Sequence, residues 1–423
     1  MTQPVSPGGP AAATSTLPRV EVIVIGAGFG GLAAAVCLAR RGVSVRVYDR
    51  VKKLGEVGAG MQVAPNCSRV LRDIGLLDET RALGVVPQKL TLMDAVAGQT
   101  LSELDLARVE ERYGAPFLVI HRSDLHGVLL RAALKLDVDL RTQMKCVAYS
   151  SSASGGRVEF ANGTTDEADV VIAADGLHSL ARPFVVDDEP VDSGYVSYRG
   201  AMPASVAASA GVRPQEVTVY AGPGCHLVQY GVRPGELVNQ MAVFRAPEGV
   251  RGRVGAEDLL KEAFAGALPV VQRSISLLWR ERCWPMIDRD PVRHWISGRV
   301  ALLGDAAHAS LQYLAQGAGM AIEDAWVLAE HATAHRDADG HVDWDAALRA
   351  YDTVRPEHCR RVVQAGRELG ELWHAEGRRR DRRNVVLPQI DLHSWAFTDW
   401  LWGPPALTPQ QEAPPFQRVP LEG

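Results

Sequence analysis

Cysteine is scarce in this 423-residue sequence, and none of its six cysteines forms a CxxC pair or another spacing typical of a metal site. The missing pairs argue against a disulfide framework and a dithiol redox relay, and they favour buried free thiols in a reducing compartment. We therefore expect a cytoplasmic protein without a bound metal. The six residues are Cys37, Cys67, Cys146, Cys225, Cys283 and Cys359.

A large surplus of charge of either sign is also missing. The net charge is -5, so no global basic field exists and nucleic acid is not an expected partner. The first eighteen residues lack the basic start and apolar core of a secretory signal, and they predict a disordered tail. Glycines interrupt the longest apolar stretch, Val20–Leu38, which favours strand, turn and helix over a membrane span.

What the sequence does have is a glycine turn, Gly26-x-Gly28-x-x-Gly31, between a strand predicted at Val20–Ile25 and a helix predicted at Gly31–Arg41. Gly26 permits a tight turn, and Gly28 lets a pyrophosphate approach the backbone. Gly31 lets helix and strand pack closely, while the helix N-terminus attracts phosphates. The turn therefore predicts a dinucleotide site.

A second predicted strand, Val43–Tyr48, ends at Asp49, whose carboxylate can accept hydrogen bonds from ribose hydroxyls. Strand, turn, helix and strand at this spacing indicate a doubly wound α/β fold. The pattern alone does not distinguish NAD from FAD.

Features far downstream favour FAD. A predicted strand at Arg299–Leu303 leads into Asp305, and ligands of parallel sheets bind at such carboxyl ends. Four residues then precede a predicted helix at Ala321–His331, whose N–H groups and dipole would stabilise negative charge on a reduced flavin. A long cofactor such as FAD could extend from Asp49 at one end of the site to the start of this helix at the other. The four residues are Gly317, Ala318, Gly319 and Met320.

Two further motifs have more than one interpretation. Asp175-Gly176 ends a predicted strand at Asp169–Ala173, and it fits either a cofactor contact or a simple turn before a capped helix. Arg122 fits either a bidentate phosphate contact or a helix start capped by Ser123.

The organisation predicted from these patterns is α/β, with a Rossmann-like FAD-binding domain interleaved with a substrate domain. Alternating residues over Tyr195–Phe244 predict a mainly antiparallel sheet for the substrate domain, and the chain after Gly304 is expected to be mainly helical. We assign residues 1–18 to the tail, 19–75, 100–185 and 285–375 to the FAD-binding domain, 76–99 and 186–284 to the substrate domain, and 376–423 to a C-terminal extension.

Together, the motifs GxGxxG, DGxxSxxR and GDAAH resemble those of the single-component FAD-dependent aromatic hydroxylases, and the likeness runs from about Val20 to Gly403. Further segments resemble, more narrowly, the 3-hydroxybenzoate 6-hydroxylases of that family. These segments are Gly55–Gly60, His121–His126, Cys225–Tyr230, Leu311–Ala318 and Thr398–Gly403.

The resemblance implies an activity. Such enzymes use tightly bound FAD, NADH and O2 to convert 3-hydroxybenzoate to gentisate (2,5-dihydroxybenzoate), and they are usually homodimers. In the implied cycle NADH reduces FAD, O2 adds to give a C4a-hydroperoxide, and a base deprotonates the phenol. Histidine suits that base because its pKa lies near neutrality.

The resemblance also assigns site residues. His226 is the expected base, Tyr230 lies on the same strand face, and Gln312 is a neutral donor to the substrate. Phe117 is expected in the substrate pocket, where relatives often carry Tyr. The cofactor contacts implied in addition are Arg50, Gln62, Val63 and Val147.

Alternatives stay open at this point. Phe117 and the Ala309-Ser310 pair, which stands where many flavin hydroxylases have Pro, bear on which ring position is attacked. A salicylate-like hydroxylase, a tailoring hydroxylase for larger phenols and a flavin dehydrogenase without oxygen transfer are the other readings. The basic run Arg378–Arg383 is interpreted as a solvated helix face or a subunit contact.

Overall fold

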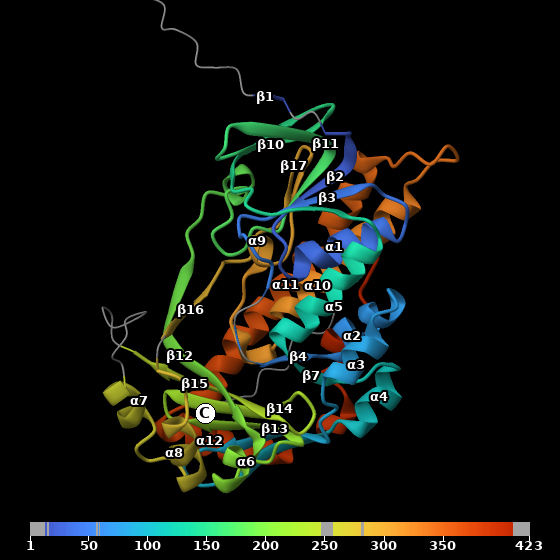
Figure 1. Ribbon diagram of the computed structural model, residues 1–423. Helices are drawn as coiled ribbons and strands as arrows, with labels where there is room; N and C mark the ends of the chain where they lie inside the picture. Colours follow the sequence, from blue (N-terminus) through green and yellow to red (C-terminus); the bar gives the residue numbers. More distant parts are fainter. Residues whose placement is uncertain are drawn as a thin grey trace, which may run out of the picture.

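The computed structural model describes residues 17–55, 58, 60–246, 257–280 and 283–408, together with the backbone of residues 13–14. Most of the predicted tail, and three residues of the motif at Gly55–Gly60, lie outside this range. Figure 1 shows one sheet at the upper end of the molecule, a second at the lower end, and a layer of long helices between them. Within the described residues, no helix combines the length and apolar character that a membrane crossing requires.

The upper sheet has nine strands, and its central path is β17-β18-β11-β2-β3-β8. The neighbours from β18 to β8 are parallel, as the predicted doubly wound fold requires. The predicted strand at Val20–Ile25 is β2, and the following helix, α1, covers Phe29–Ala39. Both are almost wholly buried because β2 lies inside the sheet and α1 packs between α10 and α5. The α/β fold class is therefore confirmed.

The strands of this upper sheet have the following bounds: β1 (Ala13–Thr14), β2 (Val20–Ile25), β3 (Val45–Tyr48), β8 (Asp139–Arg141), β9 (Cys146–Ser152), β10 (Gly155–Phe160), β11 (Thr164–Ala173), β17 (Ile296–Ser297) and β18 (Val300–Leu302). Its helices and the segments beside it are α2 (Pro65–Asp73), α3 (Leu77–Leu83), α4 (Ala107–Tyr113), α5 (Arg122–Lys135), α9 (Asp305–His308), α10 (Gly317–Ala334) and α11 (Trp344–Trp373), with the 3-10 turns η1 (Arg182–Phe184) and η2 (Gln312–Leu314). A short two-stranded sheet joins β4 (Gly60–Val63) to β7 (Leu118–His121).

The lower sheet contains the mainly antiparallel strands predicted over Tyr195–Phe244, and it is called the platform below. Its order is β16-β12-β15-β14-β13-β5-β6, antiparallel except for the β13–β5 pair. The strands are β5 (Lys89–Asp94), β6 (Thr100–Asp105), β12 (Val191–Pro203), β13 (Glu216–Gly222), β14 (Cys225–Val232), β15 (Leu237–Arg245) and β16 (Trp284–Asp288). Helix α6 (Ala204–Ser209) follows β12, and helices α7 (Glu257–Ala263) and α8 (Pro269–Ser276) pack on the sheet face that carries Tyr198, Leu227 and Phe244.

Two predicted boundaries are wrong. Residues 285–288 were assigned to the FAD-binding domain, but they belong to β16, which pairs with β12 in the platform. Residues 100–105 were also assigned to the FAD-binding domain, but they form β6, which pairs with β5 in the platform. The turn after β5 explains this second error, because Asp94 Oδ1 accepts hydrogen bonds from the backbone N–H groups of Val96 and Ala97. This side-chain-capped turn folds the chain straight back as a hairpin.

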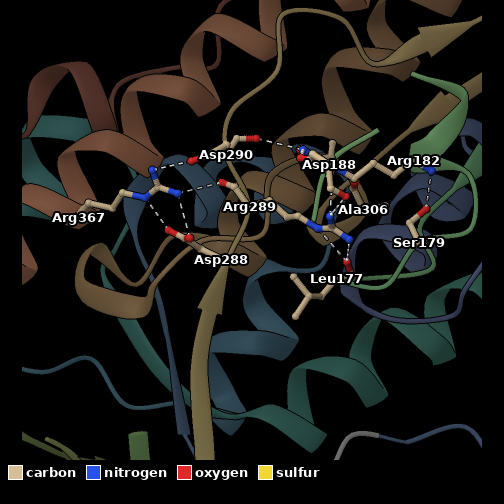
Figure 2. A network of polar contacts seen from close by, with 10 residues as sticks. Leu177, Ser179, Arg182, Asp188, Asp288, Arg289, Asp290, Ala306 and Arg367 are labelled. Atoms are coloured by element: carbon tan, nitrogen blue, oxygen red, sulfur yellow. Dashed lines mark hydrogen bonds and ion pairs between the residues drawn. The ribbon is translucent and has the colours of Figure 1, made fainter. Parts of the chain in front are cut away.

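Two of the connections between the sheets, residues 174–190 and 289–295, are joined to each other by arginine side chains. Arg182 donates to Asp188 and to the carbonyls of Ala306 and Ala307, while Arg289 donates to the same Asp188. Figure 2 shows this network, in which Arg367 of α11 holds the acids on either side of Arg289. Because both crossings are tied at one place, the platform is held in a fixed position against the FAD-binding domain.

Two arginines of the C-terminal extension, Arg380 and Arg383, bind it to the platform through ion pairs with Asp94. The carboxylate of Asp94, which is fully buried, accepts from Arg380 at 2.6 Å and 2.8 Å and from Arg383 at 2.6 Å. Arg383 is itself 0% exposed. The interpretation of this basic run as a solvated face is therefore wrong for these two arginines, since they form a buried ion cluster. The extension contains α12 (Gly377–Val386), η3 (Leu387–Gln389), η4 (Leu392–Ser394) and α13 (Asp399–Trp402).

Replacing Asp94 with alanine is expected to lower the free energy of unfolding by about 3–5 kcal/mol, because Arg383 is left as an unpaired buried charge. Denaturant titration of the holoprotein measures this loss. Glu103→Gln is the matched control, since the pair between Lys89 and Glu103 is exposed and is expected to be worth less than about 1 kcal/mol. Equal effects of the two substitutions would contradict the buried clamp.

Candidate active site

A large continuous cavity of about 1300 Å³ runs from the carboxyl edge of the upper sheet to the inner face of the platform. Its upper part is lined by the glycine turn after β2, by Asp49 at the end of β3 and by Arg122 at the start of α5. Its lower part is lined by platform side chains and by the C-terminal extension. Such a cavity has room for an extended cofactor and a second, smaller molecule.

The glycine turn shows three different environments. A Cβ on Gly31 would lie 1.9 Å from the carbonyl oxygen of Gly26, so helix α1 approaches β2 too closely for any side chain. Gly26 has a φ of +105° and is equally crowded by Ala174. A Cβ on Gly28, in contrast, meets no atom within 4 Å. The free N–H groups of the first turn of α1 therefore adjoin open space, which fits a pyrophosphate.

Carboxylates at strand ends surround the same space. Asp49 accepts hydrogen bonds from the N–H groups of Ala27 and Val51, at 2.8 Å and 2.9 Å, and each oxygen keeps a lone pair for a hydroxyl. Asp175 accepts from the hydroxyl of Tyr149, whereas its Oδ1 is buried without a hydrogen-bond partner among the described residues. Asp305, the first residue of α9, also lines the cavity.

Helix α10 begins earlier than predicted, because Gly317–Met320 form its first turn instead of preceding it. Gly317 and Ala318 line the cavity, so the orphan N–H groups of this turn adjoin it. Arg50, Gln62 and Arg122 line it as well, and the guanidinium of Arg122 lies 4.9 Å above the ring of Phe29. These donors and acceptors fit a flavin dinucleotide.

Some of the predicted cofactor residues do not reach the cavity wall. Strand alternation places Gln62 on the wall and turns the neighbouring Val63 into the core. Val147 is 46% exposed on the outside of β9, although the preceding Cys146 lines the cavity. Any contact of these residues with a cofactor would have to come from the backbone. The predicted residues that do not line the cavity are Gly31, Val63, Val147, Gly319 and Met320.

His226 lies on β14 in the lower part of the cavity and is 0% exposed. Its Nδ1 lies 2.7 Å from Nε2 of His374, and its own Nε2 is buried without a hydrogen-bond partner among the described residues. Burial and the neighbouring His374 lower the pKa of His226 well below the ordinary value of 6.5. The ring is therefore neutral at pH 7, with one nitrogen engaged and the other unengaged.

Sequence reasoning missed His374. It caps the C-terminus of α11, 148 residues away from His226, and its ring stacks on Tyr195 with the centroids 4.4 Å apart. Burial, with Arg245 and Arg383 nearby, lowers the pKa of His374 to about 3, so both rings of the pair are neutral. No motif marks this residue, because a contact between a strand and a helix end has no period in the sequence.

The other predicted substrate residues gather around His226. Tyr230 is four residues further along β14, lines the same cavity and is 5% exposed. Gln312 lines the cavity from η2, with its Nε2 buried and unpartnered among the described residues. Phe117 packs against Trp402 of α13, with ring centroids 5.6 Å apart. The structure thus brings all four predicted residues to one cavity.

The C-terminal extension closes this end of the cavity with apolar side chains. The lining side chains are Leu387 of η3, its C-cap Ile390, Leu392 of η4, and Leu401 and Trp402 of α13. The segment is tied down at several places besides Asp94, for example by the ion pair of Arg112 with Asp399. The substrate end is consequently apolar and shielded from water.

His308, Asp324 and Cys359 have potential ligand atoms within 4.8 Å of one another. The guanidinium of Arg355 already pairs with Asp324 at 2.7 Å, and His308 Nε2 lies 2.6 Å from the same carboxylate. The protein's own cation therefore occupies the place that a metal would take. All six cysteines are buried free thiols, as the sequence predicted.

Comparison with known proteins decides the family. The model of the FAD binding domain family matches residues 19–365. The chain belongs to this family. It is 33% identical over 391 residues to the 3-hydroxybenzoate 6-hydroxylase of Klebsiella oxytoca, covering 91% of this chain and 96% of that one. It is 38% identical to the 3-amino-4-hydroxybenzoate 2-monooxygenase of Streptomyces cremeus, covering 84% and 88%.

The solved structures agree. The chain superimposes on an FAD complex of a variant of HpxO from Klebsiella pneumoniae with a TM-score of 0.80 and 27% identity, covering 91% of this chain and all of that one. FAD is therefore the cofactor of this FAD-dependent aromatic hydroxylase, and the glycine turn, the strand-end acids and the start of α10 are the residues that fit it.

Proposed function

We propose that the protein hydroxylates a small phenolic carboxylic acid, with 3-hydroxybenzoate as the leading substrate, gentisate as the product, NADH as the reductant and O2 as the oxidant. The observation that supports this most is His226, a buried neutral histidine whose unpartnered Nε2 belongs to the wall of an apolar cavity. The chemistry that bound FAD supplies is acceptance of a hydride from NADH and delivery of an electrophilic oxygen atom from O2.

In the proposed reaction His226 Nε2 takes the proton of the substrate hydroxyl. His374 makes this possible by accepting the Nδ1–H of His226, which leaves the Nε2 lone pair free for the substrate. The phenolate then has its highest electron density at the carbons ortho and para to its oxygen. In 3-hydroxybenzoate the para carbon is C6, so attack at C6 gives gentisate.

Two other side chains orient the ring in this scheme. Tyr230 keeps its proton at neutral pH, because burial raises its pKa, and it can donate to the substrate. The buried amide of Gln312 can donate from the opposite wall. The apolar cover of the C-terminal extension keeps water from the reacting atoms.

A hydroxylase for a different phenolic acid is the second candidate. Phe117 offers no hydroxyl to the pocket, and a relative of comparable identity is named for 3-amino-4-hydroxybenzoate. A salicylate-like or larger phenol would use the same base, cofactor and oxidant. The homodimer and the cytoplasmic location stay predictions.

Substrate-stimulated NADH oxidation by the FAD-loaded protein tests the proposal, with products identified by mass. Stimulation by 3-hydroxybenzoate with equimolar gentisate is the expected result. Hydroxylation of another acid in the panel would move the assignment to the second candidate. Hydrogen peroxide without any hydroxylated product would show a flavin dehydrogenase or oxidase and would overturn both.

His374→Leu is expected to lower kcat about 10- to 100-fold with little change in KM, as loss of an orienting partner does. His374→Gln, which keeps an acceptor near His226, should recover part of that loss. In His374→Gln the acid limb of the kcat/KM profile should also move to higher pH, because His374 contributes to the low pKa of His226. An unchanged pH profile would show that His374 only packs.

A further inference from the structure

Arg199 is a cation in the cavity wall to which no role has yet been assigned. It lies on β12, and the strand registers align it with Met241 of β15 and, through Met241, with Val228 of β14. All three residues line the cavity. Val228 stands midway between His226 and Tyr230 on the same strand face, so Arg199 belongs to the same face of the platform as the proposed base.

The guanidinium of Arg199 has no partner in the described part of the chain. Its Nε is buried without a hydrogen bond, and no described carboxylate forms an ion pair with it. Arg199 is half-buried, with its Nε covered, whereas the fully buried arginines Arg46, Arg182, Arg355 and Arg383 each pair with at least one aspartate. A half-buried cation that faces a cavity and has no counter-ion is only partly hydrated, which indicates that an anion entering the cavity pairs with it.

The electrostatic surroundings support the same conclusion. Burial lowers the pKa of Arg199, and the nearby positive charge of Arg122 lowers it further. Arginine remains charged even so, and it can form a bidentate pair with a carboxylate. Tyr230 is close enough for its charge state to affect Arg199, which places the guanidinium on the substrate side of the cavity.

The spacing suits a single aromatic ring. Neighbouring strands lie about 4.8 Å apart, so the backbones at Val228 and Arg199 are separated by roughly 10 Å. A long arginine side chain reaches back over part of that distance. One aromatic acid can then bridge the gap, with its hydroxyl at His226 and its carboxylate at Arg199.

We propose that Arg199 binds the carboxylate of the aromatic substrate and so fixes which ring carbon faces the flavin. This inference rests on the proposed function and specifies it, because it makes a carboxylate, besides a phenol, a requirement of the site. It also accounts for a cation at the mainly apolar platform end of the cavity. The two hydroxybenzoates for which the compared relatives are named both carry this group.

The test compares an acid with its neutral amide on the oxidised, FAD-loaded protein. Binding of 3-hydroxybenzoate and of 3-hydroxybenzamide is followed through the change in flavin absorbance, without turnover. In Arg199→Met the dissociation constant of the acid is expected to rise roughly 10- to 150-fold, and that of the amide less than about 3-fold. Arg199→Lys should give an intermediate loss for the acid.

Controls separate this result from misfolding. Arg157→Met removes an arginine on β10 that pairs with Glu167 on β11, in the upper sheet, and should change neither affinity. Without ligand, Arg199→Met should melt at the wild-type temperature or higher, because it removes an unpaired, half-buried charge. The rise in melting temperature that the acid produces in the wild type should then be lost.

Other outcomes overturn the inference. Equal weakening of acid and amide would show a packing role, and weaker NADH binding with unchanged acid affinity would assign Arg199 to the nucleotide. If the wild type binds no hydroxybenzoate, the proposed substrate fails, and the comparison is repeated with acid–amide pairs of other phenols. If the wild type binds the acid of such a pair more tightly than the amide, and Arg199→Met does not, the proposed role of Arg199 is supported. If no pair shows this difference, that role is wrong.

Discussion

His226→Ala is expected to retain FAD and to lose coupled hydroxylation, with product formation lower by about 10²- to 10⁴-fold, the usual contribution of a positioned general base. The flavin should stay bound, because His226 belongs to the platform and the residues that fit the cofactor belong to the upper sheet and α10. On one preparation, flavin absorbance measures the bound FAD, oxygen uptake measures the total oxidase rate, and product yield measures the fraction of that rate coupled to hydroxylation.

The pH profile of the wild type provides a second sign of the same base. The active form is the neutral ring, and a lowered pKa keeps the ring neutral to lower pH. The midpoint of the acid limb of the kcat/KM profile should therefore lie below pH 6.5, the ordinary pKa of histidine. His341→Ala, which removes an exposed histidine from a surface loop, is the control and should leave both rate and profile unchanged. Normal product yield from His226→Ala would remove His226 from the reaction.

Gly31→Ala should give a destabilised, colourless protein. Its Cβ would lie 1.9 Å from a backbone oxygen, and only a shift of α1 away from β2 can relieve that contact. Overpacking of this kind costs about 3 kcal/mol or more where backbone cannot move. The ratio of flavin to protein absorbance and the melting temperature of the apoprotein measure the two effects.

Gly28→Ala is the matched comparison. Its Cβ meets no protein atom within 4 Å, so the apoprotein should melt at the wild-type temperature. The methyl group would nevertheless occupy the space into which a pyrophosphate fits, and FAD occupancy should fall. If Gly28→Ala binds FAD like the wild type, the phosphates do not lie over this turn. If Gly31→Ala is both stable and yellow, the close packing of α1 on β2 is wrong.

Parts of this site could be predicted from the sequence when their residues lie close together in the chain, and not when the contacting residues are far apart in it. Gly26, Gly28 and Gly31 belong to a strand, a turn and a helix that are adjacent in the sequence, so spacing alone predicted their geometry. Family likeness supplied His226 and Gln312, since an isolated histidine or glutamine carries no such signal. The end of β5 was misjudged because a capped turn at Asp94 has only a weak local pattern.

His374 and Arg199 escaped prediction for a different reason. His374 meets His226 only because a long helix ends beside the fourth strand of the platform order. Arg199 is distinguished by a buried Nε without a hydrogen-bond acceptor among the described residues. The lack of an acceptor can be recognised only when the positions of all neighbouring side chains are known. Long-range contacts and unpaired buried charges are properties of the folded chain and have no sequence period.

The clamp of Asp94 on Arg380 and Arg383 has a consequence for how the enzyme is made. During synthesis the ribosome releases the glycine turn and the start of α10 well before the C-terminal extension, and domains generally fold in the order of their release. A nascent chain can thus assemble the FAD-binding part of the cavity while its substrate end still lacks a cover. Cofactor loading would precede completion of the active site, so a ribosome stalled before Arg380 should carry a yellow but inactive chain.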